Sequence, residues 1–207
     1  MDITDNNGEP LKVPLMAERF AEGKKPEYLL WIGSAGAFDD RYKKVMRAMV
    51  TLLHHAGTDY AVLGTEETDS GDIARRGGNE MLYQMQAMTN IEVMNGYEVK
   101  KVIVCDPHDY NTFKNEYPDY GADFEAIHYA AFLKSLISEG KLKVNGEYQN
   151  KTITYHDPCY LGRANGEYQT PRDILNALHV NLKEMPRNKS FALCCGAGGG
   201  QMFKECE

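Results

Sequence analysis

The sequence lacks the features that would place it in a membrane or on nucleic acid. No stretch approaches the roughly 18 apolar residues of a membrane-spanning helix, and the N-terminal segment MDITDNNGEP is acidic, unlike a secretory signal. The chain has 23 Lys and Arg against 30 Asp and Glu, with a net charge of −7, and its basic pairs are dispersed. Because phosphate binding needs concentrated positive charge, a nucleic-acid partner is disfavoured. We expect a cytoplasmic protein, either free or at the periphery of a membrane complex, with no direct membrane span.

Cysteine is also scarce. The 207 residues contain five cysteines, namely Cys105, Cys159, Cys194, Cys195 and Cys206. In a reducing compartment cysteines serve as metal ligands, redox thiols or buried small side chains more often than as disulfides. Cys194 and Cys195 are neighbours, and adjacent cysteines form only strained disulfides. A structural disulfide is therefore disfavoured.

Short apolar runs alternate with helical patterns along the chain. We expect strands at 28–32, 60–63, 102–105, 152–155 and 190–193, and helices at 42–53, 78–95, 128–138 and 172–178, the last capped by Thr170. Strands that alternate with helices are typical of parallel sheets with helical crossovers. The sequence predicts an α/β fold with parallel sheets and flanking helices.

An internal spacing indicates duplication. Ser34, just after the first strand, lies 35 positions before Asp69, and Cys159 lies 35 positions before Cys194. Each second element is a doublet followed by glycine: Asp69-Ser70-Gly71 and Cys194-Cys195-Gly196. We predict two pseudo-repeated Rossmann-like halves, 27–122 and 123–207, after a flexible N-terminal arm, 1–26.

The second predicted half carries the residues suited to metal chemistry. Cys159 and the Cys194-Cys195 pair follow predicted strands, and the carboxyl ends of parallel strands are where α/β proteins bind ligands. Cysteine thiolates hold iron–sulfur clusters, and backbone N–H groups from Gly196 onward can stabilise their charge. His156 can donate to a cluster sulfur or to a bound substrate, or it can make a structural hydrogen bond. A phosphate-cradling loop at 196–200 is an alternative, although the Lys-Ser/Thr of a P-loop is missing.

Several motifs resemble one known family. The segments HDPCYLGR (156–163) and CCGAGGG (194–200) resemble the CCG-type cysteine-rich family, which includes heterodisulfide reductase subunits and the iron–sulfur subunits of glycolate and lactate oxidases. Further similar segments are WIGSAGAFD (31–39), GTEE (64–67) and KNEYP (114–118), so the resemblance covers about residues 12–207. It implies an iron–sulfur cluster, including the non-cubane [4Fe-4S] form, with Cys159, Cys194 and Cys195 as ligands.

The sequence departs from that family at the first of its two sites. The family has cysteine at positions where this chain has Ser34, Asp69, Ser70, Asp106 and Asp109, with Cys105 and His108 nearby. We call these five positions the degenerate first site. Oxygen ligands suit iron–sulfur clusters poorly, so this site would hold either zinc or no metal. The closing Cys-x-x-Cys of the second site is expected near position 231, beyond Glu207, and Cys206 comes too early to be part of it.

Three functions follow from these residues. The resemblance implies an electron-transfer subunit of a heterodisulfide reductase-like or 2-hydroxy-acid oxidase-like oxidoreductase, whose partners are other iron–sulfur or flavin subunits. The oxygen-for-sulfur replacements favour instead a cluster-free interaction module that keeps the fold. A dithiol enzyme using Cys194 and Cys195 directly is the third hypothesis. No catalytic residue is assigned, and the oligomeric state stays open.

Overall fold

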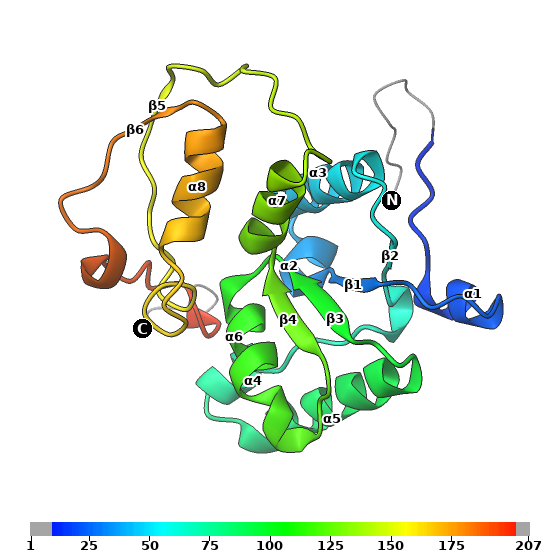
Figure 1. The fold of residues 1–207 in the computed structure, drawn as a ribbon. Coiled ribbons are helices and arrows are strands. Elements are labelled where there is room, and N and C mark those ends of the chain that lie inside the picture. The colour runs from blue at the N-terminus through cyan, green and yellow to red at the C-terminus, as the bar shows by residue number, and fades with distance from the viewer. Residues whose placement is uncertain (1–9, 202–207) are drawn as a thin grey trace.

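A four-stranded parallel sheet forms the centre of the molecule. The computed structural model describes residues 10–201. Its strands are β1 (Tyr28–Trp31), β2 (Tyr60–Ala61), β3 (Lys101–Val104) and β4 (Glu125–His128), in the order β2-β1-β3-β4 (Figure 1). Every neighbouring pair is parallel, with Leu29 opposite Val102 and Val102 opposite Ala126. The α/β prediction is confirmed.

Helices connect and cover these strands. They are α1 (Met16–Ala21), α2 (Gly33–Phe38), α3 (Tyr42–His55), α4 (Asp72–Arg76), α5 (Glu80–Gly96), α6 (Pro107–Asn115), α7 (Tyr129–Ser138) and α8 (Gln169–Ala177). Helix α3 buries one apolar stripe, Met46, Met49, Val50 and Leu53, which recur at the three-and-four spacing of one helical face. The strands expected at 28–32, 60–63 and 102–105 and the helices expected at 42–53, 78–95 and 128–138 are present, with shifted ends.

The sheet is buried on both faces, which explains its continuous apolar strands. Along β1, Leu30 packs with Met46 and Leu53 of α3, whereas Leu29 and Trp31 belong to the cluster on the opposite face. Alternation along β3 divides its side chains in the same way. This doubly covered sheet, together with its helices up to Ser138, is called the sheet region below.

A smaller part of the chain lies beside α7. Strands β5 (Thr152–Ile153) and β6 (Asn181–Leu182) form a two-stranded parallel sheet, and α8 packs against α7 (Figure 1). We call residues 152–201 the cysteine region. Its short strands do not repeat the four-stranded sheet, so the duplication read from the spacing is not visible in the described architecture.

Two local predictions in the cysteine region were wrong. Residues 189–191 form a 3-10 turn rather than part of a strand, because the Lys189 N–H donates to Asp157 and Lys189 has a left-handed φ of 52°. Thr170 lies inside α8 instead of capping it. Tyr168 is the N-cap residue, and Thr170 bonds to Glu167.

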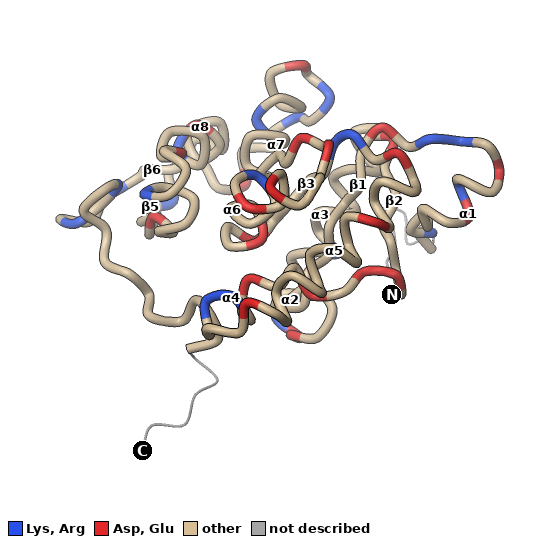
Figure 2. The backbone as a smooth tube through the Cα atoms, turned by 90° about the horizontal axis from the view of Figure 1, so that it is seen from below, with Lys and Arg blue, Asp and Glu red and all other residues tan. Residues whose placement is uncertain are grey.

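The four-stranded sheet contains residues from both sides of the boundary expected at residue 122. Strand β4 begins after residue 122 yet pairs with β3, so the sheet continues into the segment predicted to start the second half. Within the predicted arm, α1 buries Met16, and Leu15 bridges to Val62; residues 1–9 lie outside the described residues. Within residues 10–201, no helix has the length and apolar character needed to span a membrane. Lysine and arginine are scattered over several elements (Figure 2).

Candidate functional site

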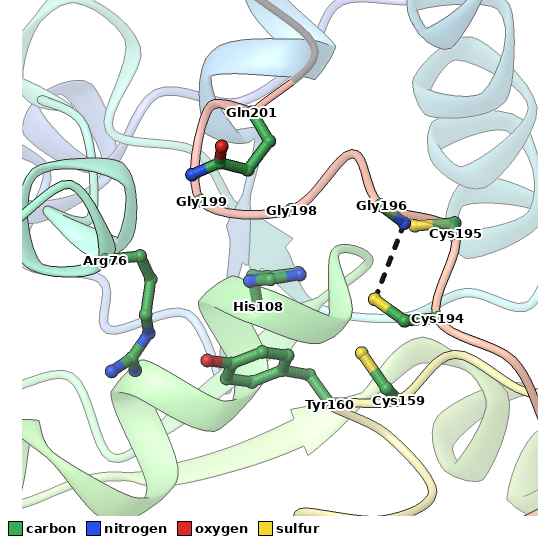
Figure 3. Close-up of a pocket in the computed structure, with 10 residues that line it drawn as sticks. All are labelled: Arg76, His108, Cys159, Tyr160, Cys194, Cys195, Gly196, Gly198, Gly199 and Gln201. Atoms are coloured by element: carbon green, nitrogen blue, oxygen red, sulfur yellow. Dashed lines mark hydrogen bonds between the residues drawn. The ribbon is translucent and has the colours of Figure 1, made fainter.

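Three cysteines meet at one pocket between the two regions. Cys159, Cys194 and Cys195 line a pocket of about 180 Å³ (Figure 3). The opposite wall comes from the sheet region, with Arg76 of α4 and His108 of α6. Tyr160, Gly196, Gly198, Gly199 and Gln201 complete the lining. The structure thus brings together the three cysteines and the glycine-rich loop that the sequence singled out.

Two side chains that flank Cys159 in sequence fix the position of the cysteine pair. His156 Nε2 donates to the carbonyl oxygen of Leu193 at 2.8 Å, and Arg163 donates to the carbonyl oxygen of Ala192. These carbonyls belong to the two residues before Cys194. His156 therefore makes a structural hydrogen bond, which was one of the roles considered for it, and Arg163 was missed by the sequence reasoning.

A buried ion network supports the same segment. Arg172 binds Asp157 through two hydrogen bonds, of 2.7 and 2.9 Å, and Glu184 through contacts of 2.6 and 3.0 Å. Asp157 also accepts the Lys189 N–H at 2.6 Å. Because Asp157 lies two residues before Cys159, this network ties the first cysteine to the turn that leads into Cys194.

The thiols lie in different electrostatic surroundings. The backbone N–H of Gly196 lies 3.4 Å from Cys194 Sγ and, together with Cys159, lowers the pKa of Cys194. Burial and the nearby Cys194 raise the pKa of Cys159. The Ala197 N–H lies 3.5 Å from Cys195 Sγ. Backbone donors at two of the three sulfurs stabilise thiolate charge.

Close packing explains the glycines of the loop. A Cβ at Gly198 would overlap the His108 ring, and one at Gly199 would lie 2.7 Å from Arg76 Cβ. Gly199 also has a φ of +64°, a conformation that side chains rarely adopt. The loop therefore packs directly on α4 and α6, and glycine is needed there because a side chain would block this close approach.

The wall opposite the cysteines is a hydrogen-bonded network. His108 Nδ1 lies 2.9 Å from Asp72 Oδ2, Asp72 Oδ1 accepts from Arg76 Nε at 3.1 Å, and Arg76 also bonds to Glu116. Burial would raise the pKa of Asp72, but His108 and Arg76 hold it below its ordinary value. Burial would lower the pKa of His108, but Asp72 raises it overall. The His108 ring stacks on Tyr160, with centroids 4.0 Å apart.

The degenerate first site consists of paired oxygen groups. Ser34 Oγ donates to Asp69 Oδ2 at 2.6 Å, and Ser70 Oγ donates to Asp109 Oδ1 at 2.5 Å. Trp31 Nε1 also donates to Asp109, at 3.0 Å, and burial together with the charge of Asp106 raises the pKa of Asp109 well above its ordinary value. Four of the five positions of the degenerate first site therefore form hydrogen bonds in pairs, Ser34 with Asp69 and Ser70 with Asp109.

Three other candidates of the first site have separate roles. Asp106 Oδ1 accepts the N–H groups of His108 and Asp109 and thereby caps α6. Cys105 is buried in the apolar cluster beside α3 and α7, and burial raises its pKa to about 12. His108 turns toward Asp72 and the cysteine pocket. The fifth cysteine, Cys206, lies outside the described residues.

The donor set of the pocket fits an iron–sulfur cluster. Among residues 10–201, no three His, Cys, Asp or Glu side chains are arranged to hold one metal ion. Three thiolates on one pocket, two of them beside backbone N–H groups, match the ligand type and the tuning donors of such clusters.

Sequence comparisons extend these observations. A family model for the CCG cysteine-rich domain matches residues 153–206. The chain is 47% identical over 197 residues to the probable iron–sulfur-binding oxidoreductase FadF of Bacillus subtilis, covering 95% of this chain and 28% of that protein. It is 49% identical over 203 residues to the EtfAB:quinone oxidoreductase of Syntrophomonas wolfei, covering 98% of this chain and 28% of that protein.

A more distant relative comes from Methanosarcina barkeri. The dihydromethanophenazine:CoB–CoM heterodisulfide reductase of Methanosarcina barkeri has a subunit that is 37% identical over 168 residues, which cover 77% of this chain and 41% of that relative. The chain thus spans less than half the length of these relatives. Together with the cysteine pocket, the matches show that this chain carries a CCG cysteine-rich domain and is homologous to part of FadF, of the EtfAB:quinone oxidoreductase and of the heterodisulfide reductase subunit.

Proposed function

We propose that this chain holds an iron–sulfur cluster at Cys159, Cys194 and Cys195 and transfers electrons within an oxidoreductase complex. The observation that carries the proposal is the convergence of these three cysteines on one pocket, with the N–H groups of Gly196 and Ala197 beside two of the sulfurs. A bound cluster supplies one-electron transfer. His156 and Arg163 position the segment that leads into Cys194. The N–H groups of Gly196 and Ala197 would stabilise the negative charge of the thiolates and the cluster.

The complex is proposed to be of the heterodisulfide reductase or 2-hydroxy-acid oxidase type. We infer partners that are iron–sulfur or flavin subunits, because the names of two relatives describe an EtfAB:quinone oxidoreductase and part of a heterodisulfide reductase. Quinones dissolve in membranes, so the similarity to the EtfAB:quinone oxidoreductase leads us to propose that this chain lies at the periphery of a membrane complex. The non-cubane [4Fe-4S] form is the cluster type that the family resemblance favours.

The degenerate first site is proposed to be a scaffold. Its serines and aspartates bond to one another in the pairs Ser34–Asp69 and Ser70–Asp109, which use the oxygens that a zinc ion would need. We also propose that the two sites arose by duplication, on the equal spacing of Ser34 to Asp69 and of Cys159 to Cys194. If the cysteine pocket also lacked a metal, the chain would be the cluster-free interaction module considered above.

Iron and sulfide content test the proposal. Protein reconstituted anaerobically with iron and sulfide should bind both in stoichiometric amounts, show visible charge-transfer absorption and lose both in the Cys159→Ser, Cys194→Ser and Cys195→Ser variants. Cys105→Ala is the matched control, since Cys105 is buried away from the pocket, and it should keep its iron. Zinc content is measured on the same samples.

Three other outcomes would favour the alternatives. Folded protein without iron after reconstitution would exclude the electron-transfer function and favour the interaction module. Thiol exchange that depends on Cys194 and Cys195 in iron-free protein would favour the dithiol enzyme. Zinc that depends on Asp69 and Asp109 would contradict the scaffold role of the first site.

A further inference from the structure

A histidine, which is a residue type that often binds metals, faces the cysteine pocket from the sheet region. His108, on α6 of the sheet region, lines the pocket together with Cys159, Cys194 and Cys195 (Figure 3). It lies between two positions of the degenerate first site, Asp106 and Asp109, yet its ring does not bond to either of them. Its side chain is 22% exposed, so the ring reaches the pocket while most of it is packed.

The ring is held in one orientation from three sides. Tyr160, which follows Cys159, stacks on one face, with centroids 4.0 Å apart and an angle of 28° between the planes. Gly198 covers another side, where a Cβ would overlap the Cε1 and Nε2 atoms. The Nδ1 atom lies 2.9 Å from Asp72 Oδ2. Since Asp72 occupies Nδ1, Nε2 is the nitrogen left for the pocket.

Asp72 is itself fixed. Its Oδ1 accepts from Arg76 Nε at 3.1 Å and lies 3.4 Å from Thr112 Oγ1, and its side chain is only 4% exposed. A carboxylate that orients Nδ1 of a histidine and raises the basicity of Nε2 is the usual second partner of metal-bound histidines.

The other non-cysteine side chains of the pocket suit iron less well. Arg76 has no lone pair and is engaged with Asp72 and Glu116. Burial raises the pKa of Tyr160, which keeps its phenol neutral. Gln201 offers a hard amide oxygen, whereas imidazole nitrogen is an established ligand of iron.

We propose that His108, oriented by Asp72, is a nitrogen ligand of the cluster held by Cys159, Cys194 and Cys195. The inference rests on the proposed function, because it needs a cluster in the pocket. The sheet region would then contribute a ligand directly, from α6, to the cluster that the cysteine region holds. When iron binds Nε2 it replaces any proton on that atom, as metals do at histidine.

Pulsed electron paramagnetic resonance of the reconstituted full chain tests the ligand. Protein labelled with ¹⁵N only in histidine should show a nitrogen hyperfine coupling to the paramagnetic cluster that changes with the isotope. Selective labelling separates this coupling from the backbone nitrogens of Gly196 and Ala197. The coupling should vanish in His108→Gln, which keeps much of the ring's volume, and persist in His54→Gln, a matched control on the exposed side of α3.

His108→Cys supplies a second measurement. A thiolate in place of imidazole should keep the cluster, abolish the histidine coupling and lower the reduction potential, because histidine ligation raises cluster potentials relative to cysteine. If His108 is only structural, the wild-type cluster shows no histidine coupling. The His108→Cys variant would then keep the reduction potential of the wild type. Circular dichroism and iron content of each variant establish that it is folded and loaded.

Three results would overturn the inference. Wild-type protein that contains the cluster but shows no histidine coupling would contradict the role of His108 and leave the electron-transfer proposal intact. A coupling that survives His108→Gln and disappears in His156→Gln would assign the nitrogen to the other histidine. Protein that takes up no iron would overturn both proposals, and iron analysis distinguishes that case from the first.

Discussion

The sheet region and the cysteine region are held together by different forces. The sheet region buries a nearly continuous set of apolar side chains on both faces of four strands, among them Leu29, Leu30, Ile103 and Phe113. The buried residues of the cysteine region include Leu161 and Ala192 but also Asp157, Thr170 and Arg172. One region is stabilised by apolar burial, and the other depends on a charged network beside its cysteines.

This difference explains how the proposed degenerate first site keeps its shape with serine and aspartate side chains. Around Ser34 and Asp109 the backbone is already fixed by the doubly covered sheet, and oxygen hydrogen bonds satisfy the replaced positions. The cysteine region has a smaller apolar core, so its ion network and any bound cluster carry more of its stability. Each prediction below tests one side of this comparison.

The largest effect is expected at Arg172. Replacing it with Met leaves Asp157 buried without its bidentate partner, which should destabilise the cysteine region by about 3–5 kcal/mol. Hydrogen exchange measured by mass spectrometry should show the loss of protection in residues 152–201, with the sheet region unchanged. Lys100→Met, which breaks the exposed pair with Asp123, is the control and should change nothing measurable. Equal loss in both regions would contradict the comparison.

A change of somewhat smaller expected size probes the sheet region. Leu30 is fully buried between β1 and α3, so Leu30→Ala should cost about 2–5 kcal/mol through lost burial and the cavity left behind. Urea unfolding followed by tryptophan fluorescence reports this, because Trp31 is the chain's single tryptophan and lies next in the same strand. Leu52→Ala, at an exposed position on α3, is the control. An unchanged urea midpoint for Leu30→Ala would mean that apolar burial does not dominate this region.

The smallest predicted effect is a pH dependence at His128. This N-cap of α7 is 3% exposed, and burial lowers its pKa from 6.5 to about 4. The unfolded chain takes up a proton below about pH 6.5 while the folded chain resists it until about pH 4. His128 therefore contributes stability above pH 6.5 that is lost as the pH falls through this window, by about 2–3 kcal/mol.

His128→Asn keeps a capping side chain and removes the titration. The free energy of unfolding of this variant should therefore vary less than that of the wild type between pH 6.5 and 4, as measured by urea unfolding at several pH values. An identical slope in both proteins would show that other groups control the acid sensitivity of the sheet region.

Apolar patterning explains which elements could be predicted from the sequence. Two strands with apolar runs and one helix with apolar residues at helical spacing were placed within a few residues: Tyr28–Trp31, Lys101–Val104 and Tyr42–His55. Strand β4 was missed because Glu125–His128 has only two apolar residues, Ala126 and Ile127, so its identity depends on pairing with β3. The false strand at 190–193 has an apolar sequence, but the bond from Lys189 to Asp157 imposes a turn.

The candidate site divides in the same way. Sequence alone determined the chemistry: the residue types and spacing of Cys159, Cys194 and Cys195, the glycines after them, and the family they resemble. Only the tertiary structure decided that Arg76 and His108 face those cysteines, that His156 and Arg163 bind the carbonyls before Cys194, and that Ser34 and Ser70 pair with aspartates. The reason is physical: a ligand type is a property of one residue, whereas a shared pocket depends on contacts between α4, α6 and loops that lie far away in the sequence, which no local pattern encodes.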